Sequence, residues 1–152
     1  MNSLFPWKGV WKPKIPKHVA FFLWIAAHGQ ILTLDNLMLK GRLLANRGCV
    51  CCCDGESLSH LLLHCPVTHS LWAFMLQAFG ILWVMLGSVT GLLSCWYQWH
   101  GKHNSDIWNL VLGCLMWILW LERNCQSFED KDKTLDELKL LCHRSLLEWS
   151  RC

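Results

Sequence analysis

Apolar side chains along this chain recur mostly at spacings of three and four residues, and no comparable stretch alternates between apolar and polar positions. Residues so spaced share one face of an α-helix, whereas strict alternation is typical of a strand. Two C-terminal stripes show the helical spacing most clearly: Trp108, Leu112, Leu115 and Leu119, and then Leu135, Leu138, Cys142, Leu146 and Trp149. Thr134 and Glu137 form a capping box at the start of the second stripe and predict a helix that begins after Thr134.

Shorter helices are predicted earlier in the chain. Residues 18–28 are apolar on nearly every side, as in a helix that is buried on most of its faces. Thr33 and Ser57 can each cap a short helix, and the second of these helices carries His60. Pro66 suits the first turn of the next helix, because proline has no backbone N–H to leave unsatisfied there.

The composition supports a folded helical protein. A chain of 152 residues is the size of one domain, and a hydrophobic content of 53% is ample for a core. We therefore expect an all-α fold, a small helical domain that occupies residues 1–152, with a helical C-terminal part over 105–150. Five large aromatic residues are assigned to its core: Trp24, Trp72, Trp108, Trp117 and Trp120.

Residues 71–99 contain no charged side chain, which raises the question of a membrane span. About twenty apolar residues suffice to cross a bilayer. The stretch is interrupted by polar residues such as Gln77 and Ser88. Gly80 is well placed to end a helix that begins near Pro66. We therefore predict a buried core helix followed by a turn, with membrane association as the less favoured alternative.

Positive charge is concentrated at the N-terminal end. The formal net charge is +3, but residues 1–48 carry seven Lys or Arg against one Asp, a net charge of +6. Four lysines of this segment are candidates for phosphate contacts: Lys8, Lys12, Lys14 and Lys17. Trp7 and Trp11 lie among them and can stack on unpaired bases, so RNA or single-stranded DNA is the expected partner. The alternative is a solvated lysine face with both tryptophans packed inward.

A cleaved signal peptide is not expected. The lysines before VAFFLWIAA imitate a basic region followed by an apolar one, but the pattern starts late and contains Pro13 and Pro16. Reduced cysteines argue for an intracellular compartment and do not choose between nucleus and cytoplasm.

Five of the ten cysteines lie in residues 49–66, CVCCCDGESLSHLLLHCP. Zn²⁺ favours four tetrahedral Cys or His ligands, and a Cys-x₂-Cys turn brings two thiolates to one ion. Cys49 and Cys52 have this spacing, and His60 and Cys65 follow at a separation that one helical turn and its exit can bring together. We therefore predict a zinc knuckle that joins a loop to a helix, with one structural zinc ion and no open position for catalysis.

Other assignments within the same segment remain open. Cys51 or Cys53 can take the place of one of the first two cysteines, and His64 can take the place of Cys65. The cysteines can also be buried thiols that serve packing alone. A Cys–His nucleophile is disfavoured, because no Gly-rich or acidic group accompanies the pair to orient a base or to hold an oxyanion. We therefore expect no enzymatic activity and no small-molecule substrate.

Several motifs follow one another in the order of a known family. They are P-x-x-V-x-F-F-x-W at 16–24, T-x-x-N-L at 33–37, C-V-x-C-x₃-E-S-x₂-H-L-L-L-x-C-P at 49–66, L-W at 71–72 and W-x₂-W-x-E-R-N at 117–124. In these motifs the chain resembles the zinc-binding domain that follows reverse transcriptase in plant LINE-type retroelements. The resemblance implies that the zinc ligands are Cys49, Cys52, His60 and Cys65. It also implies a parent polyprotein with endonuclease and reverse transcriptase activities upstream.

Three interpretations of function result. The first is a zinc-binding module derived from a retroelement polyprotein, which serves as an accessory nucleic-acid-binding domain without catalysis. The sequence has no Asp-Asp polymerase motif and no acidic spacing typical of a two-metal nuclease. The second is a structural or protein-interaction zinc domain, a domesticated or decayed fragment of such an element. The third is a membrane-associated protein that uses residues 71–99.

Overall fold

The computed structural model describes residues 15–29, 60–78, 80, 87–89, 91–93, 106–128 and 133–151. Its elements are α2 (Lys17–Ala27), the π-helix η1 (His60–His64), α4 (Pro66–Ala78), α6 (Asp106–Phe128) and α7 (Leu135–Ser150). No strand occurs within these ranges, which confirms the predicted all-α class. The short helix predicted after Thr33 lies outside the described residues, as does Ser57.

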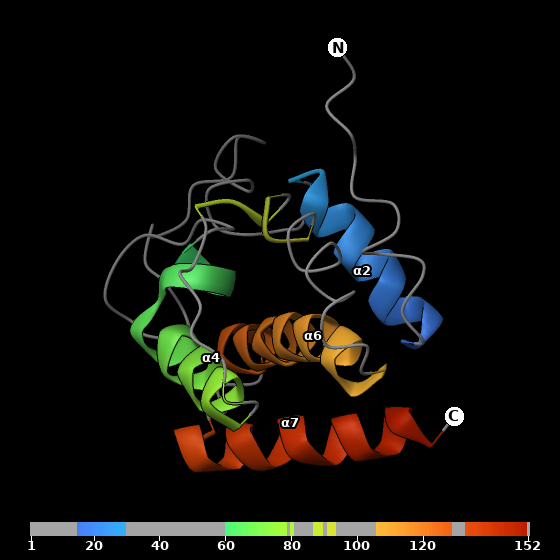
Figure 1. The fold of residues 1–152 in the computed structure, drawn as a ribbon. Helices are drawn as coiled ribbons and strands as arrows, with labels where there is room; N and C mark the ends of the chain where they lie inside the picture. Colours follow the sequence, from blue (N-terminus) through green and yellow to red (C-terminus); the bar gives the residue numbers. More distant parts are fainter. Residues whose placement is uncertain are drawn as a thin grey trace, which may run out of the picture.

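Helix α6 lies at the centre of the described fold. It contacts α2, η1, α4 and α7, and α7 also packs against α4. In Figure 1, α2 lies above α6 and α7 runs below it, while η1 and α4 flank it on the left. A helix with neighbours on several sides must be apolar on several faces. In agreement, every residue from 110 to 116 is buried.

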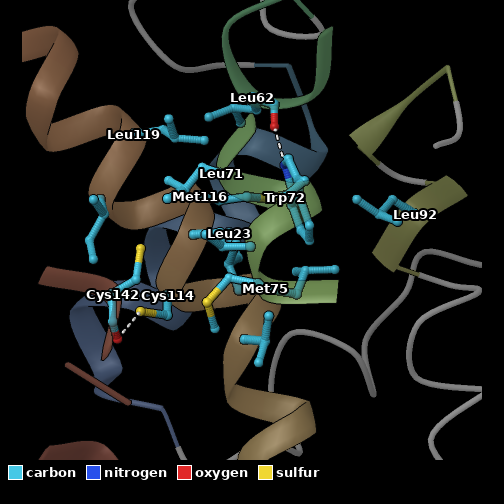
Figure 2. Packing of buried hydrophobic residues seen from close by; sticks show 14 of the residues in the cluster. Leu23, Leu62, Leu71, Trp72, Met75, Leu92, Cys114, Met116, Leu119 and Cys142 are labelled. Atoms are coloured by element: carbon cyan, nitrogen blue, oxygen red, sulfur yellow. Dashed lines mark hydrogen bonds between the residues drawn. The ribbon is translucent and has the colours of Figure 1, made fainter. Parts of the chain in front are cut away.

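One hydrophobic cluster joins the five elements. Figure 2 shows Leu23 of α2, Trp72 of α4 and Met116 of α6 in the middle of this cluster. Leu62 of η1 and Cys142 of α7 belong to it as well. Because full burial of one large apolar side chain stabilises a fold by about 1.5–3 kcal/mol, this shared core holds the short elements η1 and α4 in place.

The tryptophans assigned to the core differ in their burial. Trp72 is 1% exposed, as predicted. Trp24, Trp117 and Trp120 are half-buried and pack against the edge of the cluster. The side chain of Trp108 lies outside the described residues.

Helix α7 begins where the capping box predicts. The hydroxyl oxygen of Thr134 accepts a hydrogen bond from the backbone N of Glu137 at 3.2 Å, and Glu137 Oε2 accepts one from the backbone N of Thr134 at 3.0 Å. The predicted stripe faces the core, with Leu138, Cys142 and Leu146 buried and Leu135 and Trp149 packed against its edge. Both expectations for this helix are confirmed.

Helix α4 confirms the prediction of a core helix that starts at Pro66. It ends at Ala78, and Gly80 has a φ of 67°, a left-handed conformation that favours glycine. The backbone N of Gly80 donates to the carbonyl oxygen of Gln77 at 3.0 Å, which closes the last turn. Among the described residues, no helix has the length and the hydropathy needed to cross a bilayer.

Helix α2 is less buried than its apolar sequence predicts. One face is buried in the core through Val19, Ala20, Phe22, Leu23 and Ala26. Phe21, by contrast, exposes 54% of its surface. The main contact of α2 is with α6, so its opposite face has no comparable neighbour among the described elements. The expectation of burial on most sides is therefore wrong for the face that carries Phe21.

Candidate metal site and basic segment

Cys65 is the predicted zinc ligand whose side chain the structure describes. It lies between η1, which ends at His64, and α4, which begins at Pro66, and it is 1% exposed. Its carbonyl oxygen accepts a hydrogen bond from the backbone N of His69 at 2.7 Å, so Cys65 stands immediately before the helix. Cys65 is therefore held between the two elements with its side chain inside the fold.

Buried hydrogen bonds hold η1 against α4. The hydroxyl of Thr68 donates to the carbonyl oxygen of Leu61 at 2.6 Å, and Nε1 of Trp72 donates to the carbonyl oxygen of Leu62 at 3.0 Å (Figure 2). A π-helical turn offers its carbonyls in a pattern that an α-helix does not, and a buried carbonyl without a donor is costly. These contacts place Cys65 at the start of α4 by protein packing alone.

The remaining candidate ligands are described only in part. His60 is the first residue of η1, but its side chain lies outside the described residues, as do Cys49 and Cys52 and the alternatives Cys51 and Cys53. His64, the alternative to Cys65, is exposed. Within the described ranges, no three His, Cys, Asp or Glu side chains gather closely enough to hold a metal ion. The ligand set therefore stays a prediction.

The basic segment is represented in the structure by Lys17. This residue opens α2, and its side chain is exposed, so it is accessible to a polyanion. The other candidate phosphate contacts, Lys8, Lys12 and Lys14, lie outside the described residues together with Trp7 and Trp11. Neither the phosphate contacts nor the alternative of inward-packed tryptophans is decided by the described part of the chain.

Glu122 and Arg123 are neighbouring charged residues that are both buried, which the sequence analysis did not predict. Glu122 is 1% exposed and Arg123 is 2% exposed. Glu122 accepts hydrogen bonds from the backbone N of Lys133 at 2.8 Å and from Nε2 of Gln126 at 3.0 Å, and Nζ of Lys133 lies 3.5 Å from its Oε2. The carboxylate thus ties α6 to the residues that lead into α7. The W-x₂-W-x-E-R-N motif marks Glu122 in the sequence, but the motif by itself does not indicate that the side chain is buried.

Arg123 is packed against an aromatic ring. Its guanidinium lies 5.1 Å from the ring centroid of Trp120, and its Nη1 donates to Oδ1 of Asn124 at 3.1 Å. A guanidinium over an indole gains a cation–π attraction, which partly replaces the hydration lost on burial. The E-R-N part of the motif therefore stabilises the end of α6.

Cys114 and Cys142 meet between α6 and α7, away from the predicted knuckle. The Cys114 thiol donates to the carbonyl oxygen of Cys142 at 3.5 Å (Figure 2), and both residues are fully buried. Hydrogen bonding with Cys142 and burial raise the pKa of the Cys114 thiol far above its usual value. A thiol that stays protonated is a poor nucleophile and a poor metal ligand, so this pair serves packing.

These features define a class: a small all-α domain with a cysteine buried at the start of a helix, next to a segment rich in Cys and His. A family model described as zinc-binding in reverse transcriptase matches residues 1–72, a range that contains all four predicted ligands. The match supports a reverse-transcriptase zinc-binding domain, as the motifs indicated.

Among proteins of known sequence, the chain is similar to a "putative ribonuclease H protein" of Arabidopsis thaliana. The two are 25% identical over 145 residues, which cover 87% of this chain and 21% of that protein. The chain thus spans about a fifth of the length of this relative. No solved structure matches significantly.

Proposed function

We propose that this chain is a zinc-binding module derived from the polyprotein of a plant LINE-type retroelement, and that it binds RNA or single-stranded DNA without catalysing a reaction. One zinc ion is held by Cys49, Cys52, His60 and Cys65. The observation that carries the proposal is the family match over residues 1–72, which contains this complete donor set. Three thiolates and one imidazole are a donor set typical of a closed structural zinc site.

The position of Cys65 supports its part in this site. It lies at the N-terminus of α4 and at the end of η1, where packing holds it in place without metal. Zinc bound there joins the loop at Cys49 to two elements that contact α6, and thereby to the core. Structural zinc sites of this kind contribute free energy of folding directly. The exposure of His64 favours Cys65 over His64 as the fourth ligand.

Binding of nucleic acid is supported by charge. Residues 1–48 carry a net charge of +6 from seven Lys or Arg and one Asp, and the exposed Lys17 belongs to this segment. Contacts between lysines and phosphates release counterions, so they produce affinity that falls steeply with salt.

The zinc site is tested by elemental analysis of protein purified without added metal. We expect about one zinc per chain in the parent, as for a single closed site, and little zinc in Cys49→Ser and Cys65→Ser. Cys125→Ser is the matched control, because Cys125 is half-buried in α6 and outside the knuckle. Cys51→Ser, Cys53→Ser and His64→Gln decide between the alternative ligands. A folded parent without zinc would refute the site.

A protein-interaction role is the second candidate, and α7 favours it. Leu140 and Leu147 expose 58% and 49% of their surface on this helix. These leucines are seven residues apart, about two helical turns, so they lie on the same side of α7 and can both contact a partner. If the zinc-loaded protein binds a labelled oligonucleotide, and this binding weakens as the salt concentration rises, the nucleic-acid-binding function is supported. If the zinc-loaded protein does not bind the oligonucleotide, the protein-interaction role is the candidate that stands.

A further inference from the structure

The outer face of α2 carries a row of aromatic and basic side chains. Lys17, Phe21, Trp24 and His28 follow one another at spacings of four, three and four residues. At 3.6 residues per turn, these positions fall within about 60° of arc on one side of the helix. The residues buried against the core, such as Val19, Leu23 and Ala26, lie on the other side. We call this row the α2 ladder.

The rings of the α2 ladder are in contact with one another. Phe21 stacks on Trp24 with ring centroids 5.8 Å apart and an interplanar angle of 26°, and Trp24 lies 4.8 Å from the ring of His28. Nδ1 of His28 donates to the carbonyl oxygen of Trp24 at 2.8 Å, which orients the imidazole. The three rings therefore form a continuous and ordered surface, although Phe21 and His28 are exposed.

Lys17 gives the α2 ladder a positive charge, because residues 15–29 contain no Asp or Glu to offset it. In the sequence, three further lysines precede this segment: Lys8, Lys12 and Lys14. A surface that combines cations with exposed rings matches a single-stranded nucleic acid, because its phosphates are anionic and its bases offer unpaired aromatic faces. In a duplex the same faces are stacked inside the helix, and they cannot reach a ring on a protein surface.

We propose that the α2 ladder binds single-stranded nucleic acid, with Phe21, supported by Trp24, stacking on an unpaired base and Lys17 contacting a phosphate. The proposal rests on the nucleic-acid-binding function inferred above and names the surface that performs it. Trp24 supports the ring of Phe21, because Trp24 is half-buried against the core and stacks on Phe21, which exposes 54% of its surface. His28 extends the ring surface by one position.

The test is a fluorescence-anisotropy titration of the full zinc-loaded chain. The probes are a labelled oligothymidylate and a labelled oligouridylate of about 16 nucleotides, the upper site size of small single-strand-binding domains, and a duplex of the same length. We expect both single strands to bind more tightly than the duplex, and their ratio to show whether RNA or DNA is preferred. Equal binding of duplex and single strands would overturn the stacking contact.

Variants of Phe21 isolate the stacking contact. Phe21→Ala and Phe21→Leu are expected to weaken binding about 5- to 150-fold, the range measured when one stacking ring is removed, whereas Phe21→Trp keeps the parent affinity. Phe21→Leu keeps an apolar side chain at this position but removes the ring. A loss of affinity in this variant therefore shows that the aromatic ring itself is needed for binding. Leu140→Ala is the matched control, because Leu140 is as exposed as Phe21 but lies on α7, and it should bind like the parent.

Lys17 is tested through the salt dependence. In Lys17→Gln we expect the slope of log K against log salt to become shallower by about 0.7, the value of one lost contact with a single strand. If the parent binds single strands but the Phe21 and Lys17 variants bind identically, the α2 ladder is refuted while the proposed function stands. If the zinc-loaded parent binds neither single strand at low salt, nucleic-acid binding and the ladder fall together.

Discussion

Cysteines of the described chain lie in environments that give them different chemistry. Cys65 is buried at the N-terminus of α4. Cys114 and Cys142 are buried between two helices, and the hydrogen bond with Cys142 together with burial raises the pKa of the Cys114 thiol. Cys125 is half-buried near the end of α6. Spacing in the sequence separates the knuckle cysteines from the others, but the surroundings of each residue are set by the packing of the helices.

The raised pKa of Cys114 predicts a loss of stability in alkaline solution. The native state keeps the thiol proton, whereas the unfolded thiol releases it above pH 9.0, its usual pKa. Below this pH both states keep the proton, and the free energy of unfolding does not depend on the group. Above this pH the native state binds more protons than the unfolded state. This group alone then lowers that free energy by up to about 1.4 kcal/mol per pH unit.

Urea unfolding of the parent and of Cys114→Ala, measured on both sides of pH 9, checks this prediction. The alanine variant is less stable at every pH because it leaves a cavity, but its stability should fall less steeply with pH. Identical pH slopes in the two proteins would contradict the assignment.

Glu122 is predicted to stabilise the connection between α6 and α7. Glu122→Ala removes the acceptor for the backbone N of Lys133 and for Gln126, and it should cost about 2 kcal/mol of unfolding free energy. Leu121→Ala is the neighbouring control: Leu121 exposes 42% of its surface, so this change should cost about 0.5 kcal/mol or less. Denaturant titrations of both variants measure the change in unfolding free energy. An equal decrease in the two variants would contradict the stabilising role of the Glu122 carboxylate.

At the scale of elements, helix termini were the most predictable features. The capping box of α7, the start of α4 at Pro66 and its end near Gly80 were all expected from local sequence, because caps and left-handed glycines depend on neighbouring residues in the chain. The π-helical form of η1 was not expected. Its carbonyls are paired with Thr68 and Trp72 of the next helix, and such partners are invisible to a local pattern.

The capping box predicts a measurable contribution from Thr134. Thr134→Ala removes the oxygen that accepts from the backbone N of Glu137 and should lower the free energy of unfolding by about 1 kcal/mol. Thr134→Ser keeps that oxygen and should stay close to the parent. Because α7 packs against both α6 and α4, the loss should appear in the global thermal transition. A change confined to the ends of α7, seen by hydrogen exchange, would show that the cap acts only locally.

At the scale of the whole molecule, zinc is predicted to stabilise more than its own loop. In the zinc-loaded protein, Cys65→Ser should lose the metal and lower the melting temperature of the entire domain, because η1 and α4 share the core with α6 and α7. Calorimetry with parallel zinc analysis measures both effects, and Cys125→Ser should change neither. Full metal content together with an unchanged melting transition in Cys65→Ser would contradict the prediction.

The zinc-binding class of the domain could be predicted from the sequence, whereas the exposed outer face of α2 could not. Ligand spacing and motif order indicated a zinc-binding domain, and the family match over residues 1–72 agrees. The apolar pattern of residues 18–28 predicted a helix that is buried on most of its faces. The row of exposed Phe21, half-buried Trp24 and exposed His28 emerged only when the position of α6 showed which side of α2 is covered.

The amino-acid sequence by itself determined the helical class, the stripes that face the core and the ends of α4 and α7. These properties follow from periodicity and from contacts between residues close in the chain, which any fold of this sequence must respect. Tertiary structure decided that Phe22 is buried and Phe21 exposed, that Glu122 is enclosed, and that Cys65 is buried whereas His64 is exposed. Burial depends on which elements meet, and that meeting is settled by the packing of distant segments into one core.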